Sequence, residues 1–361
     1  MNRRQLLIGV GAVAVGGAGI AGVSLLQMGK MSDYDAGVAA TRAALALNPG
    51  IPDLVRFATL AANGHNTQPW RFRIDPQGVD ILPDPTRRTP VVDPDDHHLF
   101  ASLGCAAENL SLAATARGRA GEISFANDVV RVALGRERTS KPSELFGAIP
   151  RRQSTRAEYD GRAISAADLR RLAAAAAVPG VDLVLITERA QIDRICDLVI
   201  EGNSAQMADP AFLRELKSWL RFSPREALAA GDGLFSANSG GPALPAWLGP
   251  YMFDRFVDAQ SENEKYARQL RSSAGVAVFV SQRADREHWV RAGRACQRFA
   301  LQATALGMKQ AFVNQPVEVA RLRPELAALV GAPGRRPDIV MRFGYGPTLP
   351  YSARRPAQIV A

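Results

Sequence analysis

The sequence predicts an α+β fold in which antiparallel sheet is flanked by helices. Short alternating segments separated by turn residues, such as 70–74 and 78–82, indicate antiparallel strands. Long segments with apolar residues at helical spacing, such as 98–117 and 287–306, indicate amphipathic helices. With 361 residues, 47% of them hydrophobic, the chain can bury one large core or two of medium size.

A repeat within the chain is the third observation. The segment LGCAAENLSLAATARG (103–118) resembles AGRACQRFALQATALG (292–307) at a shift of 189 residues. Gly104 then matches Gly293, and both segments read as helices that end at a glycine. The match is consistent with a duplicated and fused fold.

The remaining elements follow from the same periodicities, taken in chain order. Helices are expected at 36–47, 51–61, 98–117, 165–176, 188–203 and 287–306. Strands are expected at 70–74, 78–82, around 121–134, and at 181–187, 275–281, 309–313 and 337–343. A linker is expected at 139–150. Residues 204–267 fit none of this core, and their glycine, proline and apolar residues suggest a lid or a peripheral helical hairpin.

The N-terminal segment, residues 1–30, has the composition of a signal. Arg3 and Arg4 precede an uncharged, glycine- and alanine-rich run that reaches Leu26. The paired arginines resemble the twin-arginine export signal, which carries folded proteins. We therefore expect an exported protein that meets the export machinery, and that is either periplasmic or tethered to the membrane by this segment.

Composition excludes some classes of function. The net charge of +9 comes almost entirely from arginine, but the basic residues are scattered and lack interleaved aromatic residues. A cofactor phosphate or an anionic membrane surface explains them better than nucleic acid does. The three cysteines, Cys105, Cys196 and Cys296, each lie in an apolar helical pattern, so no disulfide framework is expected.

The most informative segment is AANGHNTQPWRF (61–72). Gly64 permits unusual backbone angles, and Pro69 ends any preceding helix. Asn66 and Gln68 each offer amide donors and an acceptor, which suits the edge of a flat heterocycle. An ordinary polar turn, capped by Trp70 in the core, explains the same residues.

Two basic segments complete the pattern. The first, RRQSTR (151–156), gathers three guanidinium groups and two hydroxyls, which suits a phosphate, although a solvated turn has the same composition. The second, YSARRP (351–356), places two more arginines near the chain end.

Together these segments resemble the flavin-binding nitroreductase superfamily. Arg152, Ser154 and Arg156 match its R-x-S-x-[RK] element. Its P-S-x-x-N-x-Q-P-W-x-F element is matched by Asn66, Gln68, Pro69, Trp70 and Phe72, with Ala62-Asn63 in place of Pro-Ser. Arg354 and Arg355 match its C-terminal basic pair. The resemblance implies bound FMN, with the arginines and the serine on its phosphate and ring edge, and Asn63 as a substitute contact.

In that family two subunits share each flavin, and here one chain would imitate the dimer, as in the Acg-type branch. The resemblance implies halves at 36–147 and 148–361, a lid at about 204–267, and a monomeric pseudo-dimer. It also implies flavin contacts from Ala311, Asn314 and Gln315. Residues 42–52 and 173–187 lack the groups that a second site would need, so we expect one FMN per chain.

No catalytic side chain and no metal are expected, because the flavin would carry the chemistry. His65 lies in the loop and is expected to be exposed or to face the cofactor. His97 and His98 follow Asp93, Asp95 and Asp96, which fits an acidic helix start better than a metal site.

Two functions are compatible with the sequence. One is an FMN-dependent oxidoreductase that passes two electrons from a small donor to a small acceptor, such as a nitroaromatic or a quinone. The other is a flavin-binding storage or sequestering protein with little turnover. The lid and the export signal favour the second, whereas the complete set of polar groups favours the first.

Overall fold

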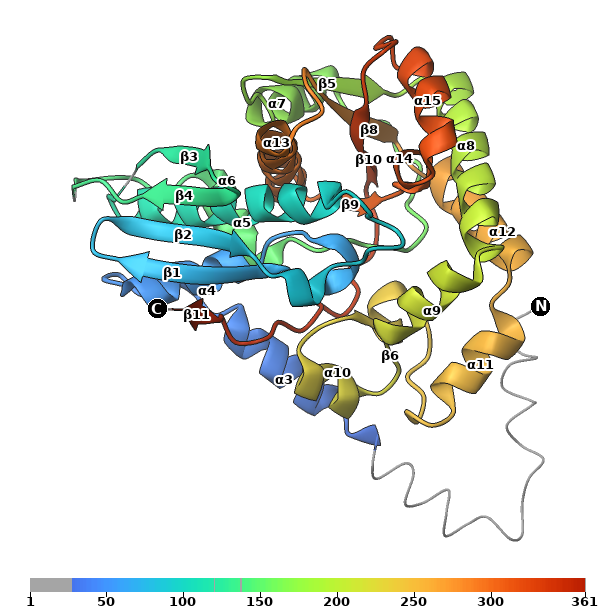
Figure 1. Ribbon diagram of the computed structural model, residues 1–361, viewed down its shortest axis with the longest axis horizontal. Helices are drawn as coiled ribbons and strands as arrows, with labels where there is room; N and C mark the ends of the chain where they lie inside the picture. The colour runs from blue at the N-terminus through green and yellow to red at the C-terminus, as the bar shows by residue number, and fades with distance from the viewer. Residues whose placement is uncertain (1–27, 120, 137, 361) are drawn as a thin grey trace, which may run out of the picture.

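The computed structural model describes residues 28–119, 121–136 and 138–360. Nearly all of the expected export signal lies outside these residues. The predicted α+β class is confirmed, because two mainly antiparallel sheets and the helices around them make up the fold (Figure 1).

The first sheet has the order β11-β1-β2-β4-β3. Its strands are β1 (Trp70–Asp75), β2 (Gly78–Pro83), β3 (Ile123–Ala126), β4 (Val129–Ala133) and β11 (Ile359–Val360). All neighbours are antiparallel except β11, which runs parallel to β1 and brings the chain end to the first half. The strand at the chain end was not predicted.

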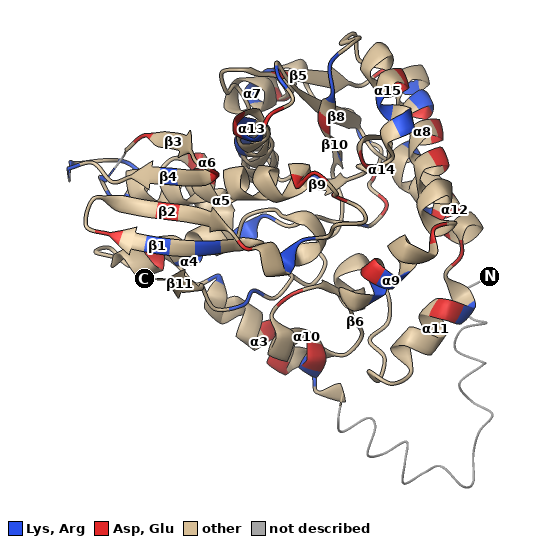
Figure 2. Cartoon of the chain, in the orientation of Figure 1, with Lys and Arg blue, Asp and Glu red and all other residues tan. Residues whose placement is uncertain are grey.

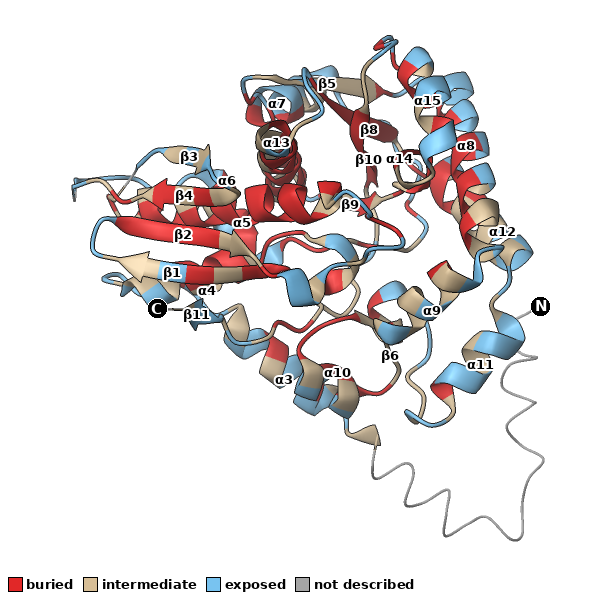
Figure 3. Ribbon diagram, in the orientation of Figure 1, coloured by how far each residue is buried: buried red, intermediate tan, exposed pale blue. Residues whose placement is uncertain are grey.

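The second sheet is antiparallel throughout, with the order β5-β8-β10-β9. Its strands are β5 (Val181–Ile186), β8 (Gly275–Ser281), β9 (Lys309–Phe312) and β10 (Pro337–Gly344). Every residue of the central strands β8 and β10 is buried, which explains their nearly continuous apolar sequence (Figure 3).

Two long helices, α5 (His97–Ala116) and α13 (Arg286–Ala305), pack against each other between the sheets (Figure 1). A Cβ atom on Gly104 would lie 2.0 Å from the Val290 carbonyl oxygen, and one on Gly293 would lie 1.9 Å from that of Ala101. Only glycine permits this backbone contact. Among the described residues, α5 alone is long and apolar enough to cross a membrane, and it is a buried core helix.

Of the other core helices, α4 (Ile51–Thr59), α7 (Ala166–Ala175) and α8 (Arg189–Met207) lie close to the predicted positions. Three more were not predicted: α12 (Ala259–Arg271), α14 (Gln315–Glu318) and α15 (Arg323–Leu329). The remaining core helix is α3 (Met31–Thr41). The prediction of helix at 36–47 was wrong at both ends. Tyr34 and Val38 are the buried face of α3, whereas Leu47 is exposed. The expected linker also contains α6 (Glu144–Ala148), which Ser143 caps.

The segment between α8 and α12 forms short helices: α9 (Pro210–Ser218), α10 (Pro224–Ala230) and α11 (Gly249–Phe256). Each has a proline in its first turn, where the missing N–H costs nothing. A two-stranded parallel pair, β6 (Leu220–Arg221) and β7 (Leu234–Phe235), joins them. These helices lie together below the second sheet in Figure 1 and form the lid segment, residues 208–258.

Candidate functional site

A cavity of about 650 Å³ lies between the lid segment and the core, within the range of small-molecule sites. Its core wall comes from α5 (Ala101, Ser102 and Cys105), from Cys296 on α13, and from the loop Ala62–His65. The turn after β9 and the helices α8 and α14 supply its polar residues.

The lid supplies most of the apolar wall. Its lining side chains include Phe212, Leu216, Phe222, Phe235, Met252, Phe253 and Phe256. Aromatic rings on one wall and amides, histidines and an arginine on the other suit a flat, apolar molecule with a polar edge. The lid segment therefore forms one wall of the cavity.

Four of the predicted contact residues line this cavity: Asn63, Arg156, Asn314 and Gln315. The Gln315 side-chain oxygen is buried without a hydrogen-bond partner. The side-chain oxygens of Asn63 and Asn314 accept from the backbone N–H groups of Gln68 and Val340, at 2.9 Å each. These contacts fix both amides at the edge of the cavity.

Arg156 lines the cavity together with two other cationic residues, Arg221 and Lys265. Those two are ion-paired with Asp232 and Glu262. Burial lowers the pKa of Arg156, and Tyr266 and Tyr159 are the neighbours that oppose this shift. No carboxylate acts on its guanidinium among the described residues. A cavity-facing guanidinium without an anion can bind an electron-rich ring edge or an anionic ligand group.

A second group of arginines lies behind the cavity wall: Arg42, Arg152 and Arg354. Arg152 is almost fully buried, and its Nε and Nη1 atoms have no hydrogen-bond partner in the described chain. The cavity-lining thiols Cys105 and Cys296 are its electrostatic neighbours.

The three guanidinium groups repel one another. Burial, and then Arg152, lower the pKa of Arg42 to about 9. Burial, followed by Arg42 and Arg152, also lowers the pKa of Arg354. Among the described residues, the only neighbours that raise the pKa of these three arginines are tyrosines and the two thiols. Uncompensated buried cations are costly, so this cluster is suited to a bound anion. Arg42 was not predicted, because only the fold brings it to Arg152.

Asn66, Gln68 and Arg355 do not line the cavity. The Asn66 amide donates to the carbonyls of Gly233 and Ala353, each at 3.1 Å. Arg354 Nη1 donates to the Asn66 oxygen at 2.6 Å. Gln68 donates to Gly231 and accepts from the Arg355 N–H, while the Arg355 side chain donates to the carbonyls of Gln68 and Trp70. The hydrogen bonds of these residues join the lid segment and the C-terminal segment to the loop before β1.

Three further predicted residues lie in the core or at a strand edge. Trp70 is 1% exposed and begins β1 in the first hydrophobic core. Ala311 is buried in β9, opposite Arg342 of β10. Ser154 forms an isolated bridge with Gln310, which holds the basic turn against β9. None of the three side chains lines the cavity.

The loop before β1 has an unusual backbone. His65, Asn66 and Gln68 have φ angles of 46°, 55° and 54°, the left-handed region that side chains rarely adopt. We expected Gly64 to carry such a conformation, but its φ is not positive. The bonds from Asn66 and Gln68 to distant segments stabilise the strained turn. His65 is half-buried and lines the cavity, and burial and Arg156 lower its pKa to about 4.

An acidic group was missed by sequence reasoning. Glu318, at the end of α14, and His98, in the first turn of α5, both line the cavity. Glu318 Oε1 lies 3.7 Å from His98 Nε2, and Gln206 Nε2 donates to Oε2 at 2.7 Å. The helix-start interpretation is confirmed, because the Asp93 carboxylate accepts from the N–H groups of His98 and Leu99.

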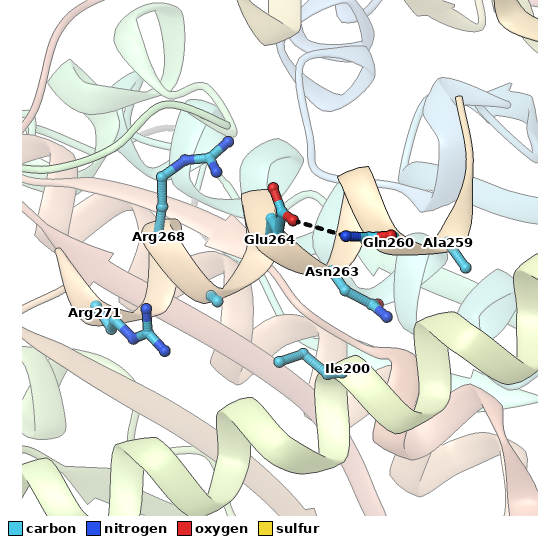
Figure 4. Close-up of a pocket in the computed structure, with 8 residues that line it drawn as sticks. Ile200, Ala259, Gln260, Asn263, Glu264, Arg268 and Arg271 are labelled. Atoms are coloured by element: carbon cyan, nitrogen blue, oxygen red, sulfur yellow. Dashed lines mark hydrogen bonds between the residues drawn. The ribbon is translucent and has the colours of Figure 1, made fainter. Parts of the chain in front are cut away.

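A separate groove of about 550 Å³ lies where α12 packs on α8 (Figure 4). Gln260 donates to Glu264, and Asn263 bonds to Asn203 and Ser204 of α8. No predicted site residue lines this groove. Lys and Arg are interspersed with Asp and Glu across the described elements (Figure 2).

No protein-family model matches the sequence. A Mycobacterium tuberculosis protein named "Putative NAD(P)H nitroreductase", from strain H37Rv, is 27% identical over 327 residues, which cover 86% of this chain and 92% of the relative. The corresponding protein of strain CDC 1551 has the same values.

Among solved structures, the FMN-dependent nitroreductase NfnB from Mycobacterium smegmatis in complex with NADPH is 13% identical. It covers 56% of this chain and 87% of its own, with a TM-score of 0.39. A nitroreductase with bound FMN from Bacteroides fragilis is 16% identical, covers 57% and 89%, and has a TM-score of 0.35. The sequence similarity to the mycobacterial relatives, over nearly the whole length of both chains, supports membership of the nitroreductase superfamily.

Proposed function

We propose that this protein is an FMN-dependent oxidoreductase of nitroreductase type. Its bound flavin would take two electrons from a nicotinamide donor and pass them to a small acceptor, such as a nitroaromatic or a quinone. The observation that carries this proposal is the set of guanidinium groups without counter-anions beside an aromatic-walled cavity. The relatives named as NAD(P)H nitroreductases support the choice of donor.

The residues present fit FMN. Arg42, Arg152 and Arg354 would hold the phosphate, because they supply guanidinium donors and the unpartnered Arg152 atoms need an acceptor. Arg156 and the amides of Asn63, Asn314 and Gln315 would hold the polar edge of the ring. When bound, the flavin supplies the two-electron chemistry, and the protein orients it and excludes water.

We further propose that the chain is a fused pseudo-dimer. At the shift of 189 residues, Ala101 corresponds to Val290 and Gly104 to Gly293. The Gly104–Val290 contact therefore corresponds to the Gly293–Ala101 contact. Such reciprocal contacts are the property of a two-fold interface, in which residue i meets j and j meets i.

Hydrogen bonds between side chains of α5 and α13 show the same reciprocal pattern as the glycine contacts. Gln297 donates to Asn109 at 2.7 Å, and Arg298 donates to Glu108 at 2.7 Å. At the same shift, Asn109 corresponds to Arg298 and Glu108 to Gln297. The two contacts are thus exchanged by the pseudo-two-fold relation, although their chemistry has diverged.

The same relation supports one degenerate site. The cavity residues Ala101, Ser102 and Cys105 correspond to Val290, Arg291 and Arg294. These three line a hollow of only about 170 Å³, beside Val178 and Pro179. Arg291 and Arg294 are paired there with Glu287 and Glu108. Large paired side chains in place of small ones favour a single flavin per chain.

The storage alternative rests on the lid. Its aromatic side chains line the cavity and narrow the space left for a bulky acceptor beside a bound flavin. A protein that holds flavin with little turnover would have the same wall. The N-terminal signal suggests export, where nicotinamide donors are scarce, and we propose that the protein is exported as a folded monomer.

The test is the visible spectrum of the purified protein, with flavin released by heat and counted per chain. One FMN per chain is expected, and two would contradict the degenerate second site. No flavin after reconstitution with excess FMN would refute the assignment. Anaerobic stopped-flow mixing with NADPH then separates the alternatives, because a storage protein would not lose its flavin absorbance within minutes.

A further inference from the structure

One carboxyl group in the cavity, that of Glu318, is not among the groups proposed to hold FMN. Glu318 lies on α14 immediately beyond the turn that carries Asn314 and Gln315, and its side chain is 19% exposed. His98, 14% exposed, faces it across 3.7 Å, and Gln206 holds its second oxygen at 2.7 Å. One carboxylate oxygen is thus anchored, and the other is free to exchange a proton with the cavity or with His98.

The surroundings favour the neutral acid. Burial raises the pKa of the Glu318 carboxyl, and the like charges of Asp93 and Glu215 add to the rise. His98 and Gln206 oppose it, but burial also lowers the pKa of His98. Tyr266, which faces the same carboxyl from α12, has its pKa raised to about 12 and stays protonated. An un-ionised carboxyl beside a neutral imidazole can donate a proton and regain one.

The proposed reaction consumes a proton that a carboxyl group of the cavity can supply. Two-electron reduction of a quinone consumes two electrons and two protons, and hydride transfer supplies both electrons but only one proton. Bulk water is the usual source of the other. Here Phe212, Phe253 and other apolar side chains line the cavity, and a proton donor on the cavity wall can take the place of bulk water.

We propose that Glu318 donates this proton to the acceptor oxygen, and that His98 then returns a proton to Glu318. This inference rests on the proposed function. In the balanced step, bound reduced FMN would supply a hydride, that is two electrons and one proton, and Glu318 would supply the second proton to a quinone oxygen. The Glu318 O–H bond breaks and the new O–H bond forms. The carboxylate is reprotonated through His98, which takes its own proton from solvent.

The test follows reoxidation of the dithionite-reduced holoprotein by two acceptors under anaerobic stopped flow. p-Benzoquinone needs a proton, whereas ferricyanide takes electrons alone. Glu318→Gln should slow reoxidation by the quinone about 100-fold or more, the usual contribution of a general acid, and leave the ferricyanide rate unchanged. Glu318→Asp should restore part of the quinone rate.

A matched control is Glu262→Gln. Glu262 also borders the cavity, but its carboxylate is ion-paired with Lys265 instead of facing His98. Both acceptors should reoxidise this variant at the normal rate. For the wild type, the quinone rate should fall as the pH rises through the pKa of Glu318, and Glu318→Gln should remove that dependence.

Equal quinone rates in wild type and Glu318→Gln would overturn the inference, while one FMN per chain would leave the proposed function intact. A second measurement needs no flavin. In the apo protein, the infrared carbonyl band of a protonated carboxyl should persist to a higher pH than that of an exposed glutamate, and Glu318→Gln should remove this component. Its absence from the wild type would also overturn the inference.

Discussion

Substitution of Arg152 should change the stability of the apo protein and its affinity for FMN in opposite directions. In Arg152→Met the side chain keeps much of its apolar volume but loses a charge that is 3% exposed and has no counter-anion in the described chain. The substitution also removes one hydrogen bond, which Arg152 donates to the Leu60 carbonyl at 3.1 Å. Replacing buried charge by apolar side chains can stabilise a protein by about 1–4 kcal/mol. After subtraction of about 1 kcal/mol for that hydrogen bond, a net gain of up to about 3 kcal/mol in the free energy of unfolding is expected.

The effect on FMN binding should have the opposite sign. The two unpartnered nitrogens of Arg152 can make two charge-assisted bonds to a phosphate, each worth about 1.5–3 kcal/mol. Their loss corresponds to about 3 kcal/mol at the lower value, or a weakening of affinity of roughly 100-fold or more. Urea unfolding of the apo protein and calorimetric FMN titration measure the two effects.

Arg151→Met is the matched control, because Arg151 is the neighbouring arginine but is exposed. It should change neither quantity by more than about 0.5 kcal/mol. A destabilised apo Arg152→Met that still binds FMN with wild-type affinity would refute the reasoning. Arg152 would then be a structural residue rather than part of an anion site.

Three further predictions concern the fold that positions the cavity. Gly104→Ala should destabilise the protein by about 1–3 kcal/mol or more in urea unfolding, because its Cβ would meet a backbone carbonyl, whereas Gly147→Ala, with open space around it, should be neutral or stabilising. Asn66→Ala should lower the free energy of unfolding by about 2–3 kcal/mol, because it leaves the buried Gly233 and Ala353 carbonyls without their donor. Limited proteolysis should then cleave the lid segment faster than in the wild type. Equal cleavage would argue that Asn66 does not hold the lid segment in place. The pKa of His65 is lowered to about 4 in the folded protein, whereas it is about 6.5 in the unfolded chain. As the pH drops from 6.5 to 4, the unfolded chain therefore binds the proton and the folded protein does not, so the free energy of unfolding should fall by up to about 3 kcal/mol. His65→Asn, which tolerates the positive φ, should flatten that decline in urea unfolding at the two pH values, and an unchanged decline would contradict it.

Local sequence determined the class of fold and most of its elements. Strand 275–281 and the helices near 98–117 and 287–306 were predicted to within a residue or two, because burial of one face imposes a period that the residues must follow. The lid helices and β11 were missed, since their apolar residues serve the cavity wall and a distant strand edge rather than a periodic core face.

The motifs likewise determined which chemical groups are available, but not what they contact. Arg152, Arg156 and Arg354 were predicted as cofactor ligands, and the fold places them beside the cavity or behind its wall. Asn66 looked equally suited to a flavin, yet its amide bonds to a carbonyl 287 residues away.

Only the tertiary structure decided which groups become neighbours. Arg42 joins Arg152 from 110 residues away, and Glu318 meets His98 across two different helices. The physical reason is that residue type and spacing set local backbone conformation, whereas burial, charge repulsion and hydrogen-bond partners depend on segments that are distant in the chain.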